Sequence, residues 1–221
     1  MKIFVIIPAY NEITHIGAVV DDVKQYIADV IVVDDCSKDG TAMAAAKHGA
    51  VVLRHVVNRG QGAALQTGNE YALEHGAEII AHFDADGQHQ AKDISRLIEP
   101  VILGAVDVVF GSRFLEGARG EIPLTKRFLI LPMARLVNRL FTGLWLSDGH
   151  NGLRAMNRKA TELVRITQDR MAHNTEIPSL VARHGLQLKE VPMDVVYHKY
   201  GRGVFDGVRI LWDLVKGKVI H

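Results

Sequence analysis

Residues 3–41 read IFVIIPAYNEITHIGAVVDDVKQYIADVIVVDDCSKDGT, and the order of patterns in this stretch decides the fold. Residues 3–7 and 30–33 are short apolar runs rich in β-branched residues, which are typical of buried strands. Between them, apolar side chains recur every three or four positions and favour a helix with one buried stripe. That stripe consists of Ile13, Ile16, Val20, Val23 and Ile27. The order strand, helix, strand predicts a βαβ unit with parallel strands.

The alternation of strand and helix continues as far as residue 110. Further apolar runs occur at 50–53, 78–82 and 106–110. We expect a helix over 40–48, whose first turn can be capped by Ser37 or Asp39, and a second helix over 62–75. This alternation predicts the α/β class, with a mostly parallel sheet flanked by helices. Ligands of such sheets bind at the carboxyl ends of the strands.

After residue 110 the pattern changes. The segments expected there are a loop over 111–121, a helical segment over 123–146 interrupted at Pro132, a polar loop over 148–154, a helix over 174–184 with Asn174 as its N-cap, strands near 187–191 and 194–198, and an amphipathic helix over 204–219. No internal repeat, low-complexity tract or linker separates these segments. We therefore expect one domain over 1–203 that continues into a C-terminal amphipathic helix over 204–221.

The composition is that of one large globular domain. The 221 residues are 48% hydrophobic and 23% charged. The single cysteine, Cys36, excludes a disulfide within the chain and a zinc site built on cysteines, and it favours a reducing compartment. The N-terminal apolar run is too short for a signal peptide, and no stretch of about 20 uncharged apolar residues could span a bilayer. We therefore expect a cytoplasmic protein.

The net charge of +1 conceals two halves of opposite sign. Residues 1–110 carry 8 basic and 15 acidic side chains, whereas residues 111–221 carry 18 basic and 10 acidic ones. This asymmetry indicates a cation or metal ligand on one side and an anion on the other; the alternative is uneven decoration of the surface. Nucleic acid is not expected as a partner, because the pI is only 7.9 and few aromatic residues accompany the basic ones.

Residues 84–89, DADGQH, directly follow the fourth expected strand. Asp84 and Asp86 can converge on one divalent ion, and Gln88 adds a neutral oxygen. Hard oxygen ligands suit Mg²⁺ or Mn²⁺, and a magnesium ion commonly combines one or two carboxylates with substrate phosphates. His89 is either a further ligand or an ordinary loop side chain. The alternative for the pair is a turn that happens to contain two acids.

Polar residues also follow the first two expected strands. Tyr10 offers a face on which a base can stack, and Glu12 offers an acceptor. Asp34 and Asp35 can accept hydrogen bonds from a base or from ribose hydroxyls, or they can cap the next helix. Residues 58–63, NRGQGA, do not form a dinucleotide fingerprint, because a leucine occupies the third glycine position. We interpret them as the start of a helix whose small residues let a ligand or a strand approach closely.

Seven motifs together resemble the nucleotide-sugar-dependent glycosyltransferases of family 2, which have the GT-A fold. Within that family the chain is most similar to the dolichol-phosphate mannosyltransferase group, which transfers a sugar to a polyprenyl phosphate. The resemblance covers essentially the whole chain. The motifs are PAYNE at 8–12, VVDDCSKDGT at 32–41, NRGQGAAL at 58–65, DADGQH at 84–89, GSRF at 111–114, DGHNGLRAMNR at 148–158 and EVPM at 190–193.

The resemblance implies a role for each matching residue. It assigns the nucleotide sugar to Pro8, Ala9, Tyr10, Glu12, Asp34, Asp35, Gly62, Asp84 and Ala85. It assigns the metal, Mg²⁺ or Mn²⁺, to Asp84, Asp86 and Gln88. It assigns the acceptor phosphate to Arg113, Arg127, Arg154 and Arg202, and catalysis to Asp86, Asp148 and Arg113. Two departures from the family concern Gln61, where many relatives have lysine, and the segment YGRG at 200–203, where Gly203 and Val204 replace serine and lysine.

The chemistry of sugar transfer agrees with these roles. A divalent ion can stabilise the departing diphosphate. A phosphate acceptor is already anionic near neutral pH, so it needs no strong base; it needs arginines, whose planar fork matches phosphate. Asp148 then either positions or deprotonates the acceptor; the alternative is an ordinary turn residue of its loop. We expect inversion at the anomeric carbon.

Two other functions remain open at this point. One is transfer to a sugar hydroxyl in polysaccharide or glycolipid synthesis, which requires a general base. The other is a nucleotide-sugar-binding protein without turnover. Intact Asp84, Asp86 and Arg113 argue against the second alternative.

The helical segment 123–146 carries four basic side chains and no acidic one, and the C-terminal helix adds Trp212, Lys216 and Lys218. Such segments are typical of helices that lie in a membrane interface. The alternative is a core helix together with a dimer contact. We expect a peripheral protein at the cytoplasmic face of a membrane, and we leave open a homodimer or a membrane-protein partner.

Overall fold

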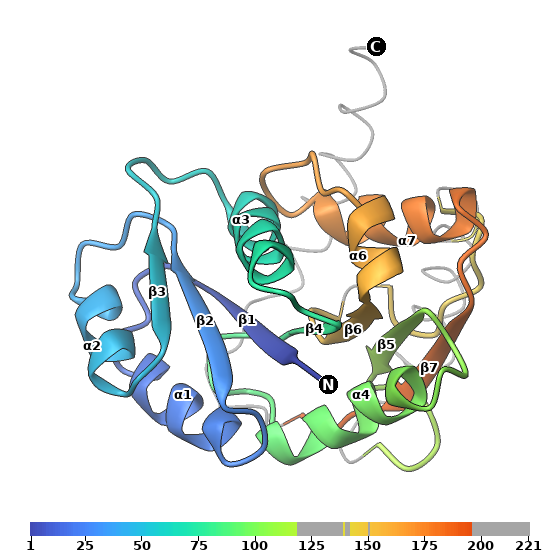
Figure 1. The fold of residues 1–221 in the computed structure, drawn as a ribbon, viewed down its shortest axis with the longest axis horizontal. Coiled ribbons are helices and arrows are strands. Elements are labelled where there is room, and N and C mark those ends of the chain that lie inside the picture. Colours follow the sequence, from blue (N-terminus) through green and yellow to red (C-terminus); the bar gives the residue numbers. More distant parts are fainter. Residues whose placement is uncertain (119–138, 140–141, 150, 196–221) are drawn as a thin grey trace, which may run out of the picture.

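The structure, a computed structural model, describes residues 1–118, 139, 142–149 and 151–195 (Figure 1). The strands are β1 (Ile3–Ala9), β2 (Asp29–Asp34), β3 (Val51–Arg54), β4 (Ile79–His82), β5 (Val108–Ser112), β6 (Arg154–Asn157) and β7 (Leu188–Pro192). The helices are α1 (Ile16–Lys24), α2 (Thr41–Lys47), α3 (Gln61–Glu74), the 3₁₀ turn η1 (Ala91–Asp93), α4 (Ile94–Ile102), α6 (Arg158–Leu163) and α7 (His173–Arg183).

The strands form one seven-stranded sheet in the order β3-β2-β1-β4-β6-β5-β7. β1 runs parallel to β2 and β4, β2 runs parallel to β3, and β5 runs parallel to β7. Only β6 is reversed, since it pairs antiparallel with both β4 and β5. The α/β class and the mostly parallel sheet are therefore confirmed. The carboxyl ends of six strands and the first residue of β6, Arg154, share one edge.

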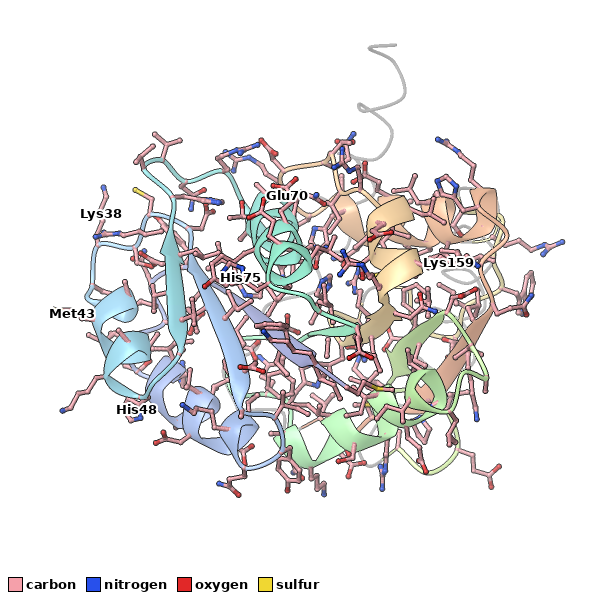
Figure 2. All side chains as sticks on the ribbon, in the orientation of Figure 1. Lys38, Met43, His48, Glu70, His75 and Lys159 are labelled. Atoms are coloured by element: carbon pink, nitrogen blue, oxygen red, sulfur yellow. The ribbon has the colours of Figure 1, made fainter. Side chains whose placement is uncertain are left out.

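The core lies on both faces of the sheet, because successive residues of the central strands point to opposite sides. Val5 and Ile7 join a cluster with α1 and α4, whereas Phe4 and Ile6 join a second cluster with α3, α6 and α7. Figure 1 shows α1 and α4 on one side of the sheet and α3, α6 and α7 on the other. Side chains fill the space between these layers (Figure 2). Burial on both faces explains why these strands are continuous apolar runs in the sequence.

Some local expectations were wrong. Residue 174 is not the N-cap of α7: Ala172 occupies that position, and the Asn174 side chain accepts a hydrogen bond from Arg154. The loop expected over 148–154 ends one residue early, because Arg154 begins β6. Of the strand expected at 194–198, Val195 forms an isolated bridge with His89, and residues 196–198 lie outside the described residues.

Several predictions concern residues that the structure does not describe. These are most of the segment 123–146, the helix expected over 204–221, and the side chains of Arg127 and Arg202. Among the helices that the structure does describe, none combines the length and the apolar character needed to cross a bilayer.

Candidate active site

The motif residues of the first two strands gather at the shared carboxyl edge of the sheet. The loop after β1 is tied to the loop after β2 by the Asn11 amide, which donates to Ser37 Oγ (2.9 Å), and by the Glu12 amide, which donates to Thr41 Oγ1 (2.9 Å). Asn11 has a φ of 55°, so the chain turns sharply here. The turn leaves the Tyr10 side chain exposed at the edge. Its ring can therefore serve as the stacking face predicted for a base.

The two acids at the end of β2, Asp34 in the strand and Asp35 just after it, are buried and form polar contacts within the protein. Asp34 forms an ion pair with Arg54 Nε (3.0 Å). The Asp35 carboxylate accepts from His55 Nδ1 (2.8 Å) and from the amides of Arg59 (2.9 Å) and Gly60 (2.6 Å). Asp35 thus fixes the loop that leads into α3, and Asp34 holds the end of β3. Their predicted contact with a nucleotide stays a prediction.

Gly62 lies against another segment of the chain. A Cβ at this position would overlap the carbonyl oxygen of Gln168, and the neighbouring Ala63 amide donates to the carbonyl of Asp169 (3.1 Å). The small residues at the start of α3 therefore admit the connection between α6 and α7. The interpretation that small residues here allow a close approach is correct, but the approaching group is the backbone of residues 168–169 and not a ligand or a strand. The predicted contact of Gly62 with the nucleotide sugar stays a prediction.

The acidic loop after β4 contains Asp84 and Asp86. The Asp84 side chain is 23% exposed and lies 3.5 Å from His89 Nε2, and Gln61 Nε2 donates to it (3.2 Å). Asp86 Oδ1 accepts a hydrogen bond from the backbone N–H of Gln88 (3.0 Å), and this bond closes a tight turn. Ala85, between the two acids, is buried. The predicted metal residues are thus neighbours in one loop.

The electrostatic surroundings keep Asp84 ionised. Burial alone would raise the pKa of the Asp84 carboxyl, but the hydrogen bond and charge of His89, together with the charge of Arg154, lower this pKa from its usual value. Gly152 packs against the same carboxylate, and a Cβ on Gly152 would lie 2.5 Å from both Asp84 oxygens. Only a residue without a side chain fits here, so the loop at 151–153 closes directly over the acid.

The donor set fits a hard divalent ion that brings its other ligands with the substrate. Within the described residues, no group of three or more histidine, cysteine or acidic side chains could hold a metal ion by itself. Two carboxylates in one loop, which also contains Gln88, match the partial protein coordination that Mg²⁺ or Mn²⁺ accepts when phosphates complete the shell.

Arg154 is placed differently from a residue that receives a phosphate from solvent. It is 1% exposed, and it donates to the carbonyls of Gly152 (3.2 Å) and Asn151 (3.1 Å) and to Asn174 Oδ1 (2.9 Å). Burial lowers the pKa of its guanidinium to about 10, against the opposing charge of Asp84, so the group stays charged at neutral pH. Arg154 therefore fixes the loop 151–153, whose Gly152 packs against Asp84.

Two buried histidines, His82 and His173, lie close enough to Arg154 for its charge to affect them. Burial, reinforced by the charge of Arg154, lowers the pKa of His173 to about 4 and the pKa of His82 well below its usual value. His82 Nε2 contacts Asn69 Oδ1 (2.8 Å), and His173 Nδ1 contacts the carbonyl of Arg170 (2.6 Å). Both are neutral packing groups at pH 7. The sequence had no signal for this cluster, since its members come from separate elements.

Arg113 and Asp148 form a bidentate pair at the end of β5. Arg113 Nε donates to Asp148 Oδ2 (2.7 Å), Nη2 donates to Oδ1 (2.9 Å), and the Arg113 amide also donates to Oδ2 (3.1 Å). The Asp148 side chain is 2% exposed, whereas that of Arg113 is 29% exposed. Both residues were predicted as catalytic, but the contact between them was not. Asp148 thereby fixes the direction of a cation that stays partly accessible to solvent.

The sequence comparisons decide the family. A model of the family described as Glycosyl transferase family 2 matches residues 4–164. The chain belongs to this family. It is a glycosyltransferase, and the resemblance noted from its motifs is confirmed.

Relatives of this family 2 glycosyltransferase match it over nearly its whole length. The UDP-N-acetylglucosamine–dolichyl-phosphate N-acetylglucosaminyltransferase of Methanococcus voltae is 31% identical over 99% of this chain and 98% of its own. The undecaprenyl-phosphate mannosyltransferase of Micrococcus luteus is 32% identical over 94% of this chain and 88% of its own.

The fold of the family 2 enzyme also has solved counterparts. The glucosyl-3-phosphoglycerate synthase of Mycobacterium tuberculosis, solved with Mn²⁺, UDP and glucosyl-3-phosphoglycerate, superposes with a TM-score of 0.69 at 20% identity. The match covers 94% of this chain and 75% of that one. The expected GT-A fold is thereby confirmed.

Proposed function

We propose that this family 2 glycosyltransferase transfers a sugar from a nucleotide diphosphate sugar, GDP-mannose or a UDP-hexose, to a polyprenyl phosphate, with inversion and with Mg²⁺ or Mn²⁺. The observation that carries the proposal is the Arg113–Asp148 pair at the edge of the sheet that also holds the acidic loop. The two relatives named above carry dolichyl phosphate and undecaprenyl phosphate in their names, which supports the same class of acceptor.

On the donor side, the loops after β1, β2 and β4 bind and orient the nucleotide sugar. Tyr10 stacks on the base. Asp84 and Asp86, with Gln88, would hold the divalent ion, which when bound supplies positive charge to the diphosphate leaving group. His89 and Gln61 keep the Asp84 carboxylate oriented, and the loop 151–153 shields it from water.

On the acceptor side, Arg113 receives the phosphate. Its side chain is 29% exposed, and Asp148 fixes the direction of its guanidinium through two hydrogen bonds. Both oxygens of Asp148 are occupied by this contact. Asp148 is therefore a positioning group, and its place supports a phosphate acceptor over a sugar hydroxyl, which would need a free base.

A polyprenyl phosphate is anchored in a bilayer, so the enzyme must reach the membrane surface. We propose that it binds peripherally at the cytoplasmic face of a membrane. Within the described residues, the support comes from Trp145, which is exposed, with the Arg139 guanidinium 5.5 Å from its ring centroid. A tryptophan paired with a cation suits the membrane–water interface. A homodimer or a membrane-protein partner stays a prediction.

Transfer of radiolabel from a panel of GDP- and UDP-sugars to a polyprenyl phosphate, in the presence of Mn²⁺, tests the proposal. We expect label from one donor to enter the organic phase and Asp86→Asn to abolish this. The anomeric configuration of the product, read by NMR, should be opposite to that of the donor. Release of free sugar without label in lipid would refute the acceptor and keep the donor. No turnover with any donor would contradict the whole proposal.

A further inference from the structure

Glu190 has no role in the proposed function, yet its carboxylate accepts four hydrogen bonds. It lies on β7 opposite Phe110 of β5, and its carboxylate reaches the segment just before Asp148. Ser147 donates its amide to Glu190 Oε1 (2.9 Å) and Oε2 (3.0 Å) and its hydroxyl to Oε1 (2.7 Å). The Asp148 amide also donates to Oε1 (3.3 Å). Hydrogen bonds to a carboxylate are stronger than those between neutral groups, so two consecutive residues are held firmly.

The same segment is tied to β5 from its other side. Ser147 Oγ lies 2.5 Å from Ser112 Oγ, and Ser112 Oγ accepts the amide of Phe114 (3.1 Å). Ser112 and Phe114 flank Arg113. The side chain of residue 146, a leucine, is buried in the second core cluster. Hydrogen bonds therefore run from Glu190 directly to the Asp148 amide, and through Ser147 and Ser112 to the amide of Phe114, the residue next to Arg113.

We propose that Glu190 is a positioning residue for the acceptor: through Ser147 and Asp148 it sets the direction of the Arg113 guanidinium. This inference rests on the proposed function, since Arg113 is the phosphate ligand there. Because Oε1 accepts three of the four bonds, one correctly placed oxygen suffices for most of the effect. Glu190→Gln should therefore retain the geometry, whereas Glu190→Ala should lose it.

Asp107 provides a matched control. It is also a carboxylate that ties a backbone amide at the side of β5, since it accepts from the Gln187 amide (3.0 Å) and from Asn157 Nδ2 (2.9 Å). It lies at the opposite end of β5, near Lys159 (Figure 2), whose ammonium is 3.5 Å from it. Asp107→Ala thus removes a comparable tie without touching the segment at 147–148.

The first measurement is hydrogen–deuterium exchange of the full-length variants. Glu190→Ala should speed exchange in the peptide that covers 144–149 and in the peptide that contains Arg113, whose amide depends on Asp148. Glu190→Gln should leave both close to wild type, and Asp107→Ala should change neither. Unchanged exchange in Glu190→Ala would overturn the inference. This readout needs no turnover, so it decides the claim even if the protein transfers no sugar to lipid.

The second measurement is steady-state transfer to polyprenyl phosphate. Glu190→Ala should raise the acceptor KM by about tenfold or more, because small displacements of a binding group have large effects, and should change the donor KM by less than about twofold. Glu190→Gln should restore the acceptor KM. Equal changes in both KM values, or values equal to those of Asp107→Ala, would overturn the inference. If Glu190→Ala does not fold, Glu190→Asp replaces it, since the shorter side chain withdraws the carboxylate; an unchanged acceptor KM in Glu190→Asp would also overturn it.

Discussion

At the scale of single residues, substitution of Asp148 tests whether this carboxylate positions Arg113 or acts as a general base. Asp148→Asn would break the bidentate contact with Arg113, because an amide presents a nitrogen donor where one oxygen now accepts. We expect the acceptor KM to rise about tenfold to a hundredfold with a smaller fall in kcat. Steady-state kinetics check this. If Asp148 were the base, kcat would instead drop by about 10²- to 10⁴-fold at an unchanged acceptor KM.

Gly152 provides a second test at the residue scale, because its substitution should weaken binding of the metal ion. Because a Cβ there would lie 2.5 Å from both Asp84 oxygens, Gly152→Ala should displace the carboxylate. We expect the Mn²⁺ concentration for half-maximal activity to rise about tenfold to a hundredfold, as for other groups that orient a metal ligand. Gly17→Ala is the control, since its Cβ would meet only the His48 side chain. Equal metal titrations for the two variants would contradict this role of Gly152.

The residue types at the site could be predicted, and their partners could not. Asp84, Asp86 and Arg113 follow apolar strands, so the sequence alone placed them at one edge of a sheet. The contacts of Arg113 with Asp148 and of Ser147 with Glu190 span 35 and 43 positions in the chain. Such contacts depend on how β5, β7 and the loop at 147–148 pack together. No local pattern encodes that packing.

At the scale of elements, buried parallel strands were predictable and β6 was not. The central strands are buried on both faces, so their apolar runs are visible in the sequence. By contrast, β6 has four residues, RAMN, with polar residues at both ends, and it becomes a strand because β4 and β5 offer their edges to it. Its first residue shows the same dependence on context: Arg154, expected at a phosphate, is buried behind the site.

Arg154 is therefore expected to matter first for the stability of this element and the loop before it. Arg154→Met would leave the carbonyls of Asn151 and Gly152 and the Asn174 amide oxygen without their donor. We expect the free energy of unfolding in urea to fall by about 2–4 kcal/mol. Arg183→Met, at the exposed end of α7, should cost less than about 0.5 kcal/mol. Similar midpoints for both variants would show that Arg154 is not a structural tie.

At the scale of the whole molecule, the buried histidines predict how stability depends on pH. The pKa of His173 is lowered to about 4 in the folded protein, and that of His82 is also far below its unfolded value. Between the unfolded and folded pKa values, the unfolded chain binds more protons, so stability falls as pH falls. Below about pH 6.5, each histidine should lower the free energy of unfolding by up to about 1.4 kcal/mol for every pH unit. Above that pH, both imidazoles are neutral in the folded and the unfolded chain, so the free energy of unfolding should not depend on their protonation.

Chemical denaturation between about pH 7.5 and about pH 5 measures this slope, and His173→Gln should flatten it. Asp93 acts in the opposite direction, because burial raises its folded pKa; its effect begins nearer the usual carboxyl range, so the histidines dominate close to pH 6. A stability that does not change between pH 7 and pH 5 would show that the two imidazoles become protonated within the folded protein.

The central claim for the whole molecule is that the acceptor is a lipid phosphate, held by an arginine that an aspartate fixes. The most direct test is transfer of labelled sugar to polyprenyl phosphate compared with the unphosphorylated polyprenol of the same chain length, under identical conditions. We predict that label enters the lipid only when the phosphate is present. Equal labelling of the polyprenol would contradict the claim, because it would require activation of a hydroxyl that neither Arg113 nor the engaged Asp148 can provide.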